Sequence, residues 1–327
     1  MKLIIQIPCL NEEETLPLVL RELPHELPGI DVIETLIIDD GSTDRTVDVA
    51  RQAGVTHIIS HPRNFGLARA FQTGLDSCLA LGADIIVHTD ADNQYPSRYI
   101  AELVKPIVSG QSEMVIGTRP IADISHFSPF KKALQSLGSW VVRTVSGTDV
   151  PDTTSGFRAY SRDFALRYQS LTRFSYTLET IIMAGQRGQT ILHFPIEVND
   201  PTRVSRLHKG SFHFVRRQAA TIVRLYAFYE PLKTFFYLSL PFLLVGLGLL
   251  LRFALNYLSG SSGLIQSVSI GVGMLIISVF IAAFGLLADI SNKHRLLTEE
   301  TLYRLKKLDF DEPLTIQGRK HPPHNHE

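Results

Sequence analysis

Residues 83–97 read ADIIVHTDADNQYPS, and this stretch determines what fold and chemistry to expect. The apolar run 83–87 is typical of a buried strand, and Asp90 and Asp92 follow it one residue apart. Alternate side chains of an extended segment point the same way, so the two carboxylates can share one cation, with Gln94 adding an amide oxygen. Few oxygen ligands with room for water suit Mg²⁺ or Mn²⁺ held together with a substrate diphosphate. The alternative is a polar turn after a strand.

The composition narrows the class of protein. With 327 residues and a formal net charge of zero, the chain is long enough for one large domain, or a domain with an appendage. Zero net charge gives no case for nucleic-acid binding. The two cysteines, Cys9 and Cys78, make neither a disulfide framework nor a metal-site spacing, which indicates buried residues in a reducing compartment.

Strand-like and helix-like segments alternate along the first third of the chain. Strands are predicted over residues 3–7, 32–38, 57–60, 85–89 and 114–117. Helices are predicted between them, over residues 13–26, 43–53, 67–81 and 98–108, and later over 130–145 and 176–186, before a strand over 190–198. This order predicts an α/β fold with a doubly wound, mostly parallel sheet. Polar clusters follow the strands that end at residues 7, 38, 89 and 117, where such sheets bind ligands.

The C-terminal part is far more apolar. Residues 212–229 have the pattern of a basic amphipathic helix, which predicts a helix in the membrane interface; an ordinary helix packed on the domain is the alternative. The stretches 235–258 and 264–288 are each long enough to span a bilayer, which takes about 20 residues. The linker 259–263 is short, so the two helices form a hairpin.

Basic residues flank both open ends of this hairpin, and the tip carries none. The positive-inside rule therefore predicts a multi-pass protein of the plasma (inner) membrane, with its catalytic domain and C-terminus in the cytoplasm. The expected division is a catalytic domain over 1–208, a juxtamembrane amphipathic helix over 209–232, a transmembrane hairpin over 233–290, and a cytoplasmic helix with a disordered tail over 291–327.

Five sequence blocks occur in one order and at family-like intervals: IPCLNEEETL, IIDDGSTDRT, NFGLARAFQTGL, HTDADNQYPS and VIGTR. Over about residues 1–230 the chain resembles the family-2 glycosyltransferases of the GT-A fold, and most of all the dolichol- and polyprenyl-phosphate hexosyltransferase branch. The resemblance implies a metal-dependent, inverting transfer of a hexose from a nucleotide sugar to a polyprenyl phosphate, giving a lipid-linked monosaccharide. On resemblance alone a UDP-sugar is favoured as donor, with GDP-mannose second.

The resemblance also implies roles for individual residues. The catalytic residues would be Asp90, Asp92 and Arg119. The cation, Mg²⁺ or Mn²⁺, would be held by Asp90, Asp92 and Gln94. Residues of two loops would bind the nucleotide: Pro8, Leu10, Asn11, Glu12, Asp39 and Asp40. Among these, Asp39 would support the second loop.

The acceptor phosphate would be held by cationic and hydroxyl groups: Arg119, Ser155, Arg158, Arg203 and Arg206. Arg203 and Arg206 could instead form a basic patch that faces the membrane. A phosphomonoester has a second pKa of roughly 6, so it is already an anionic nucleophile and needs cations to position it more than a general base. Glu179 could approach the site or be a carboxylate on a helix surface.

Three other functions compete with this one. A processive polysaccharide synthase would carry a Gln-x-x-Arg-Trp block, which is absent because the only tryptophan is Trp140. A membrane-tethered transferase acting on a protein or a lipid-linked oligosaccharide remains the main alternative, and a non-enzymatic scaffold does not explain the Asp90–Gln94 set. Small residues in the apolar stretches permit the helix contacts of a homo-oligomer: Gly246, Gly248, Gly271 and Gly273.

Overall fold

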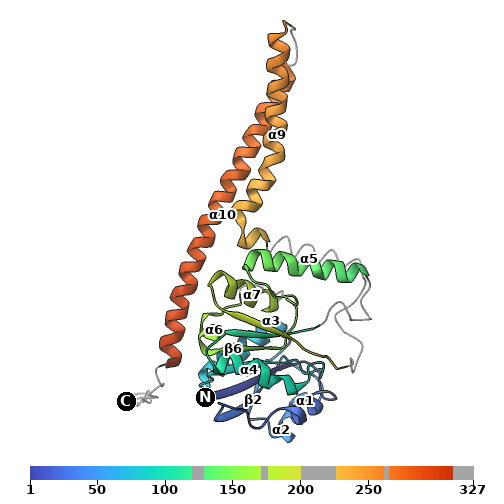
Figure 1. Ribbon diagram of the computed structural model, residues 1–327, viewed down its shortest axis with the longest axis vertical. Helices are drawn as coiled ribbons and strands as arrows, with labels where there is room; N and C mark the ends of the chain where they lie inside the picture. Colours follow the sequence, from blue (N-terminus) through green and yellow to red (C-terminus); the bar gives the residue numbers. More distant parts are fainter. Residues whose placement is uncertain (120–128, 171–175, 200–225, 261–264, 312–327) are drawn as a thin grey trace, which may run out of the picture.

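A seven-stranded sheet forms the centre of the N-terminal domain (Figure 1). The computed structural model describes residues 1–119, 129–170, 176–199, 226–260 and 265–311. The strand order is β3-β2-β1-β4-β6-β5-β7. The strands are β1 (Lys2–Cys9), β2 (Val32–Asp39), β3 (His57–Ser60), β4 (Ile85–His88), β5 (Met114–Thr118), β6 (Arg158–Ser161) and β7 (Ile191–Pro195). Only β6 runs antiparallel to its neighbours, so the predicted doubly wound, mostly parallel sheet is confirmed.

Helices cover both faces of this sheet because its strands are apolar on both sides. Leu3 and Ile5 point to one apolar cluster and Ile4 to the other. The first face carries α1 (Leu16–Glu22), α2 (Thr46–Gln52) and α4 (Ile100–Val108), which follows the 3₁₀ turn η1 (Ser97–Tyr99). The second face carries α3 (Leu67–Ala80), α5 (Pro129–Ser146), α6 (Arg162–Arg167) and α7 (Tyr176–Gln186).

The strand β6 and the short helix α6 are not predicted by the sequence. The four residues of β6 are Arg158, Ala159, Tyr160 and Ser161, which lack the alternation of apolar and polar residues that marks a strand. Tertiary packing imposes the extended conformation, since β6 fills the gap between β4 and β5. The strand β7 also ends at Pro195, earlier than predicted, where its partner β5 ends at Thr118.

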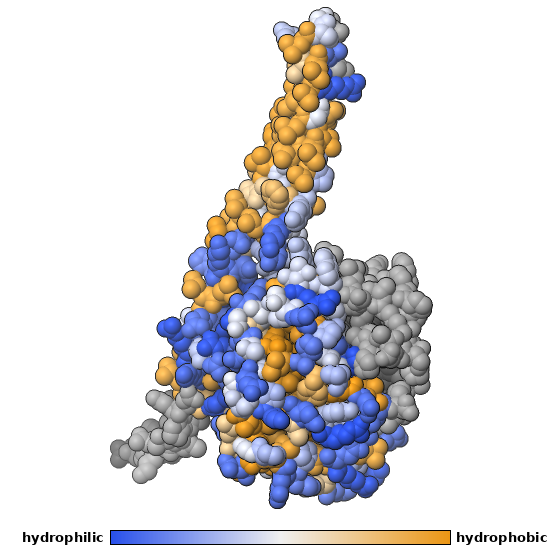
Figure 2. Space-filling view, viewed as in Figure 1, coloured by the Kyte–Doolittle hydropathy of each residue, from blue (hydrophilic) through white to orange (hydrophobic). Residues whose placement is uncertain are grey.

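Two long helices, α9 (Pro231–Leu258) and α10 (Ile265–Asp311), stand away from the domain as a hairpin (Figure 1). Both are long and apolar enough to cross a membrane, and only 11% and 17% of their most apolar windows are buried. Figure 2 shows an apolar surface along most of the hairpin. The predicted amphipathic helix lies outside the described residues up to position 225, and residues 226–229 are helical.

Small residues bring the two helices of the hairpin together. A Cβ atom added at Gly246 would lie 2.9 Å from the carbonyl oxygen of Gly271, so glycine permits this close approach. Gly248 and Gly273 face open space. Two of the four glycines expected at an oligomer contact therefore serve the packing of the hairpin itself.

The helix α10 continues past its apolar part without a break and lies along the domain beside α6 (Figure 1). Glu299 accepts hydrogen bonds from Arg187, in the turn just after α7, at 2.9 Å and from Arg295 at 2.8 Å. Further along, the Tyr303 hydroxyl donates to Asp163 of α6 at 2.8 Å. These contacts attach the hairpin to the N-terminal domain.

Replacing Glu299 with glutamine is expected to loosen this attachment. The Glu299 side chain is only 12% exposed, so the lost charge-assisted hydrogen bonds are worth about 1.5–3 kcal/mol. Amide hydrogen exchange in residues 296–311 should therefore accelerate by roughly 10- to 100-fold. The matched variant Glu300→Gln, whose side chain is 42% exposed, should change exchange little; equal protection in both variants would contradict the role of Glu299.

Candidate active site

The loops that follow β1 and β2 are held together by side-chain contacts to backbone amides. Asn11 adopts a left-handed conformation with φ 55°. Its side-chain Oδ1 accepts a hydrogen bond from the Thr43 amide at 2.7 Å, and its own amide donates to Ser42 Oγ at 2.9 Å. The Glu12 amide donates to Thr46 Oγ1 at 2.8 Å. Asn11 and Glu12, both predicted to bind the nucleotide, thus lie at the same edge of the sheet, in a loop that these hydrogen bonds hold in place.

The two aspartates at the end of β2 are buried. Asp39 accepts a hydrogen bond from the Ser42 amide at 3.0 Å, which fits its expected part in supporting the loop. Asp40 lies 2.7 Å from His61 Nδ1 and accepts hydrogen bonds from the amides of residues 65–66 at 3.0 and 2.8 Å. Asp40 is predicted to contact the nucleotide, and in this structure its oxygens hold the loop after β3. Gly41 permits this turn: at φ 80°, a Cβ atom there would lie 2.6 Å from the backbone of Arg63.

The remaining members of the predicted nucleotide set lie at the end of β1. Pro8 is buried within β1, and Leu10 is partly exposed just beyond it. The structure therefore brings Leu10 and Asn11 to the open edge and keeps Pro8 inside the sheet.

The acidic pair lies just past the end of β4, on a loop with a defined shape. Asp92 Oδ1 accepts a hydrogen bond from the Gln94 amide at 3.2 Å, and Asn93 between them is left-handed with φ 59°. Asn199, which follows β7, donates from its side chain to the Asn93 carbonyl at 2.9 Å and from its amide to the Gln94 carbonyl at 2.9 Å. These hydrogen bonds connect the loop to the segment that follows the edge strand β7.

The donor set at this loop fits a divalent cation shared with a substrate. Asp90 has a side chain that is 33% exposed, and Asp92 and Gln94 are also partly exposed, so hard oxygen atoms face a space that solvent can reach. No three His, Cys, Asp or Glu side chains gather into a metal cluster within the described part of the chain. A cation at this loop would thus take its remaining ligands from water and a diphosphate, as Mg²⁺ and Mn²⁺ do.

Negative charge accumulates around this edge of the sheet. Burial, and after it the charges of Glu12, Asp39, Asp44 and Asp90, raise the pKa of the Cys9 thiol well above its usual value. Cys9 lies at the end of β1, so these four carboxylates surround the point where β1, β2 and β4 end. The arrangement suits a cation and repels an anion that arrives without one.

Arg119 is the cation next to this acidic edge. Its Nε donates to Asp152 Oδ2 at 2.8 Å, and its Nη2 donates to Asp152 Oδ1 at 3.2 Å and to Thr154 Oγ1 at 2.8 Å. Asp152 is fully buried, which alone would raise its pKa, but the hydrogen bonds from Arg119 outweigh burial and lower it. This bidentate pair fixes the guanidinium, whose side chain is 18% exposed.

Replacing Asp152 with asparagine tests this pair through its pH dependence. We expect the variant to lose about 2 kcal/mol of stability at pH 7, since a charge-assisted hydrogen bond is removed. The folded-state pKa of Asp152 is lower than the unfolded value of 3.8, so its contribution is present above about pH 4 and is lost as the pH falls through the folded value. Thermal unfolding of both proteins from pH 7 to pH 3 should show the difference shrinking at the acid end; a constant difference would contradict the ion pair.

Two residues predicted to bind the acceptor phosphate are in the protein interior, and these assignments are corrected. Arg158 is completely buried; it donates to the carbonyl oxygens of Ser155 at 2.8 Å, Thr177 at 2.8 Å and Thr153 at 3.0 Å. Ser155 is also fully buried, and its hydroxyl donates to the Gly117 carbonyl at 2.5 Å. Both residues shape the loop 152–157 from within. Arg203 and Arg206 lie outside the described residues.

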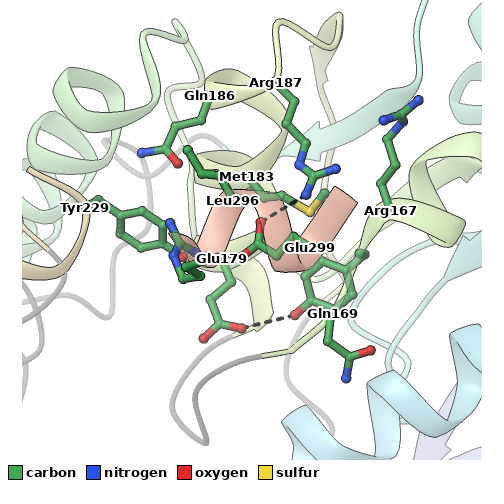
Figure 3. Close-up of a pocket in the computed structure, with 11 residues that line it drawn as sticks. Arg167, Gln169, Glu179, Met183, Gln186, Arg187, Tyr229, Leu296 and Glu299 are labelled. Carbon is green, nitrogen blue, oxygen red and sulfur yellow. Dashed lines mark hydrogen bonds and ion pairs between the residues drawn. The ribbon is translucent and has the colours of Figure 1, made fainter. Parts of the chain in front are cut away.

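Glu179 belongs to a different part of the molecule. It is buried, accepts hydrogen bonds from the hydroxyls of Tyr168 at 3.2 Å and Ser170 at 3.4 Å, and lines a small cavity between α7 and α10 (Figure 3). The cavity has a volume of about 20 Å³, which is room for roughly one water molecule. The cavity is too small for a nucleotide sugar, so the open edge with Asp90 and Asp92 is the better candidate.

Three residues around the site are not predicted by the sequence. Asp152 anchors Arg119, while His88 and Tyr176 lie directly below Asp90. His88 precedes the acidic pair by two residues, and a polar residue inside an apolar strand is the signal that could have identified it. Asp152 lies three residues before Ser155, which the family resemblance assigns to the acceptor phosphate. Tyr176 has no local signal, because only the fold brings α7 to the end of β4.

Comparison with known proteins places this arrangement in context. The sequence profile described as glycosyl transferase family 2 matches residues 4–168. A UDP-N-acetylglucosamine–dolichyl-phosphate N-acetylglucosaminyltransferase of Methanococcus voltae is 31% identical over 215 residues, which cover 58% of this chain and 83% of that protein. An undecaprenyl-phosphate mannosyltransferase of Micrococcus luteus is 28% identical over 207 residues, covering 60% of this chain and 83% of that protein.

A similar fold is found among solved structures. The glucosyl-3-phosphoglycerate synthase of Mycobacterium tuberculosis, crystallised with Mn²⁺, UDP and glucosyl-3-phosphoglycerate, superposes with a TM-score of 0.52 at 21% identity. The match covers 69% of this chain and 79% of that chain. At this identity the likeness establishes the fold of the N-terminal domain and no more.

Proposed function

Because the chain belongs to glycosyl transferase family 2, we propose that it transfers a hexose from a nucleotide sugar to a polyprenyl phosphate at the cytoplasmic face of a membrane. The family expected from the sequence blocks is confirmed, and the chain is a glycosyltransferase with a GT-A-like catalytic domain. The observation that carries the proposal is the position of the acidic pair. Asp90 and Asp92 lie at the carboxyl edge of the sheet, next to Arg119, in a chain that also has an apolar hairpin.

The donor is a nucleotide sugar, with a UDP-sugar favoured over GDP-mannose. Its diphosphate would be held through Mg²⁺ or Mn²⁺ by Asp90, Asp92 and Gln94, and its nucleoside would lie over the loops at Leu10 and Asn11. When bound, the cation supplies positive charge that stabilises the departing diphosphate. The carboxylates of the chain hold the donor in one orientation, with its anomeric carbon turned toward the acceptor. The relative from Methanococcus voltae is named for a UDP-N-acetylglucosamine donor, which supports a UDP-sugar here.

The acceptor is a lipid phosphate whose oxygen attacks the anomeric carbon in one displacement, with inversion. The phosphate is an anion near neutral pH, so the chain needs to orient it and does not need to take a proton from it. Arg119 would perform this orientation, because Asp152 fixes its guanidinium next to Asp90. The relatives named above act on dolichyl phosphate and undecaprenyl phosphate, which supports a polyprenyl phosphate here.

The hairpin would hold the catalytic domain at the surface where the lipid phosphate lies. Basic side chains such as Lys233 and Lys293 flank its open end, which supports a cytoplasmic domain and C-terminus in the plasma membrane of the cell. The polar extension of α10, docked on α6 and α7, would keep the domain close to the membrane. Where the small residues Gly248 and Gly273 face lipid, a second copy of the chain could pack.

A transfer assay on the detergent-purified, full-length protein tests this function. Radiolabelled UDP-glucose, UDP-N-acetylglucosamine, UDP-galactose and GDP-mannose are each offered with undecaprenyl phosphate or dolichyl phosphate, in Mn²⁺, Mg²⁺ or EDTA. We expect label from one donor in the organic phase, only when a divalent cation is present. Nucleotide binding without lipid label from any donor would contradict a lipid-phosphate acceptor and point to a tethered transferase with a protein or oligosaccharide acceptor.

A further inference from the structure

A line of buried polar side chains runs beneath the acidic pair. His88, the last residue of β4, is completely buried and lies two residues before Asp90. In the sheet it pairs with Gln6 of β1 on one side and Arg158 of β6 on the other. Gln6 is also completely buried, and its side-chain nitrogen lies 3.2 Å from His88 Nδ1. Polar groups at such depth are costly unless they serve a contact that an apolar residue cannot make.

The other ring nitrogen of His88 faces the active site. Its Nε2 lies 2.9 Å from the Tyr176 hydroxyl and 3.7 Å from Asp90 Oδ1. When the Gln6 amide donates to Nδ1, the ring proton is on Nε2, between the hydroxyl oxygen and the carboxylate. Both partners attract this N–H group, so the His88 ring links the interior of the sheet to the carboxylate.

Tyr176 and Gly156 complete the surroundings of Asp90. Tyr176 is 3% exposed, and its ring stacks on Phe71 of α3 with a centroid distance of 4.2 Å. A Cβ atom added at Gly156 would lie 2.8 Å from the Tyr176 hydroxyl and 3.1 Å from Asp90 Oδ2. The hydroxyl and the carboxylate therefore lie against the same stretch of backbone, with no room for a side chain at Gly156.

Gly74 of α3 leaves room for the Gln6 side chain, the first of these buried polar groups. A Cβ atom added at Gly74 would lie 2.0 Å from Gln6 Oε1, so α3 can pass over the buried amide only with glycine there. The Gln6 side chain is in turn held under α3, where it reaches the His88 ring. The line of polar groups is thus built into the packing of α3, α7 and β4.

We propose that His88 and Tyr176 are positioning residues that hold the Asp90 carboxylate in the orientation needed to bind a divalent cation together with the donor diphosphate. The inference rests on the proposed function and deepens it. Outer hydrogen-bond partners of metal-binding carboxylates fix their orientation, and removing such a partner typically weakens metal binding by roughly 10- to 100-fold. His88 lies 3.7 Å from Asp90, and the Tyr176 hydroxyl holds the His88 ring in place. Both side chains are buried, so they leave the exposed side of Asp90 open to the cation.

The experiment measures Mn²⁺ binding directly, in full-length protein saturated with UDP, by calorimetry. Tyr176→Phe removes one hydroxyl and keeps the ring that stacks on Phe71, while His88→Phe removes both ring nitrogens. Tyr160→Phe is the matched control, because Tyr160 is buried in the same aromatic cluster, 5.8 Å from Phe71, and its hydroxyl neighbours are Arg158 and Thr180. UDP binding in EDTA and the melting temperature are recorded for each protein.

We expect Tyr176→Phe to weaken Mn²⁺ binding by roughly tenfold and His88→Phe by more, with UDP binding in EDTA unchanged. The Tyr160→Phe protein should bind Mn²⁺ as the parent does. In transfer assays, kcat should fall in the first two variants while the KM for the lipid phosphate stays constant. The melting temperature of Tyr176→Phe should stay within a few degrees of the parent, since no stacking contact is lost.

Each result separates the inference from the proposed function. Equal Mn²⁺ affinity in the parent and in Tyr176→Phe would overturn the positioning role while leaving the transferase intact. The same loss in Tyr160→Phe as in Tyr176→Phe would also overturn it, because the effect would then come from the cluster as a whole. A parent protein that binds neither Mn²⁺ nor UDP would overturn the proposed donor and, with it, this inference.

Discussion

Replacing Asp92 with asparagine is expected to reduce the rate of sugar transfer by roughly 10²- to 10³-fold and to leave the fold intact. Asparagine keeps a side-chain oxygen in the same place, so the hydrogen bond from the Gln94 amide, 3.2 Å long in the parent, can persist. What is lost is one negative charge at a position where a divalent cation and a diphosphate would meet. The cation then binds less tightly, and the charge of the departing diphosphate is poorly compensated.

The measurement is kcat/KM for the donor at saturating lipid phosphate, over a range of Mn²⁺ concentrations. Asp48→Asn is the matched control, because Asp48 is an exposed carboxylate of α2 with an ion pair of 3.4 Å to Arg51 of the same helix. It should transfer sugar at the parent rate. An Asp92→Asn protein with parent activity would remove the metal-binding role from the acidic pair.

The second large effect is expected on stability, from replacing Arg158 with methionine. The change would leave the carbonyl oxygens of Thr153 and Ser155 without the guanidinium that donates to them in the buried interior, while the Thr177 carbonyl keeps the Thr180 hydroxyl as a donor. An unsatisfied buried polar group costs about 1–3 kcal/mol, so the domain should lose about 3 kcal/mol or more. For a domain of this size the melting temperature would fall by roughly 10 °C.

Thermal unfolding of the purified variants decides this prediction. Arg143→Met is the control, because Arg143 has a side chain that is 35% exposed and a loose ion pair of 3.9 Å with Asp149. Its melting temperature should change by no more than a few degrees. If Arg158→Met melted like the parent and only raised the KM for the lipid phosphate, Arg158 would be a phosphate ligand after all, as the family resemblance first suggested.

Local sequence patterns predict the parts of the site that depend on a single strand and the loop that follows it. The apolar run before Asp90 identifies β4, and the spacing of Asp90 and Asp92 identifies the candidate cation site. The same logic places Asn11 and Asp39 at the ends of β1 and β2, where the structure has them. Parallel strands end at one edge of a sheet, so these loops meet without any knowledge of long-range contacts.

The sequence does not show which polar side chains are buried, because their burial depends on contacts between distant segments. Arg158 has the sequence context of a polar loop, and only the pairing of β6 with β4 and β5 shows that it is internal. Asp40 was assigned to the nucleotide by resemblance, whereas its carboxylate is turned to His61 and the loop after β3. A single sequence does not show that both Asp39 and Asp40 are buried, with their carboxylates hydrogen-bonded to neighbouring loops.

The length of α10 illustrates a different limit. The sequence predicts a cytoplasmic helix after the apolar run ends near residue 288, but not that one continuous helix extends to Asp311. Past that point charged residues spaced four apart stabilise the helix, with pairs of 2.8 Å between Arg295 and Glu299 and 3.1 Å between Arg304 and Glu300. The docking of this segment on α6 and α7 depends on contacts with residues more than a hundred positions away.

The central claim is that the nucleophile is a lipid phosphate, and a paired-acceptor assay tests it most directly. The full-length protein receives one labelled nucleotide sugar, Mn²⁺, and either undecaprenyl phosphate or undecaprenol, which differ only in the phosphate group. We predict labelled lipid from the phosphate and none from the alcohol, because the proposed mechanism orients an anion and takes no proton from it. Equal labelling of the alcohol, or no labelled lipid from either acceptor, would contradict the account.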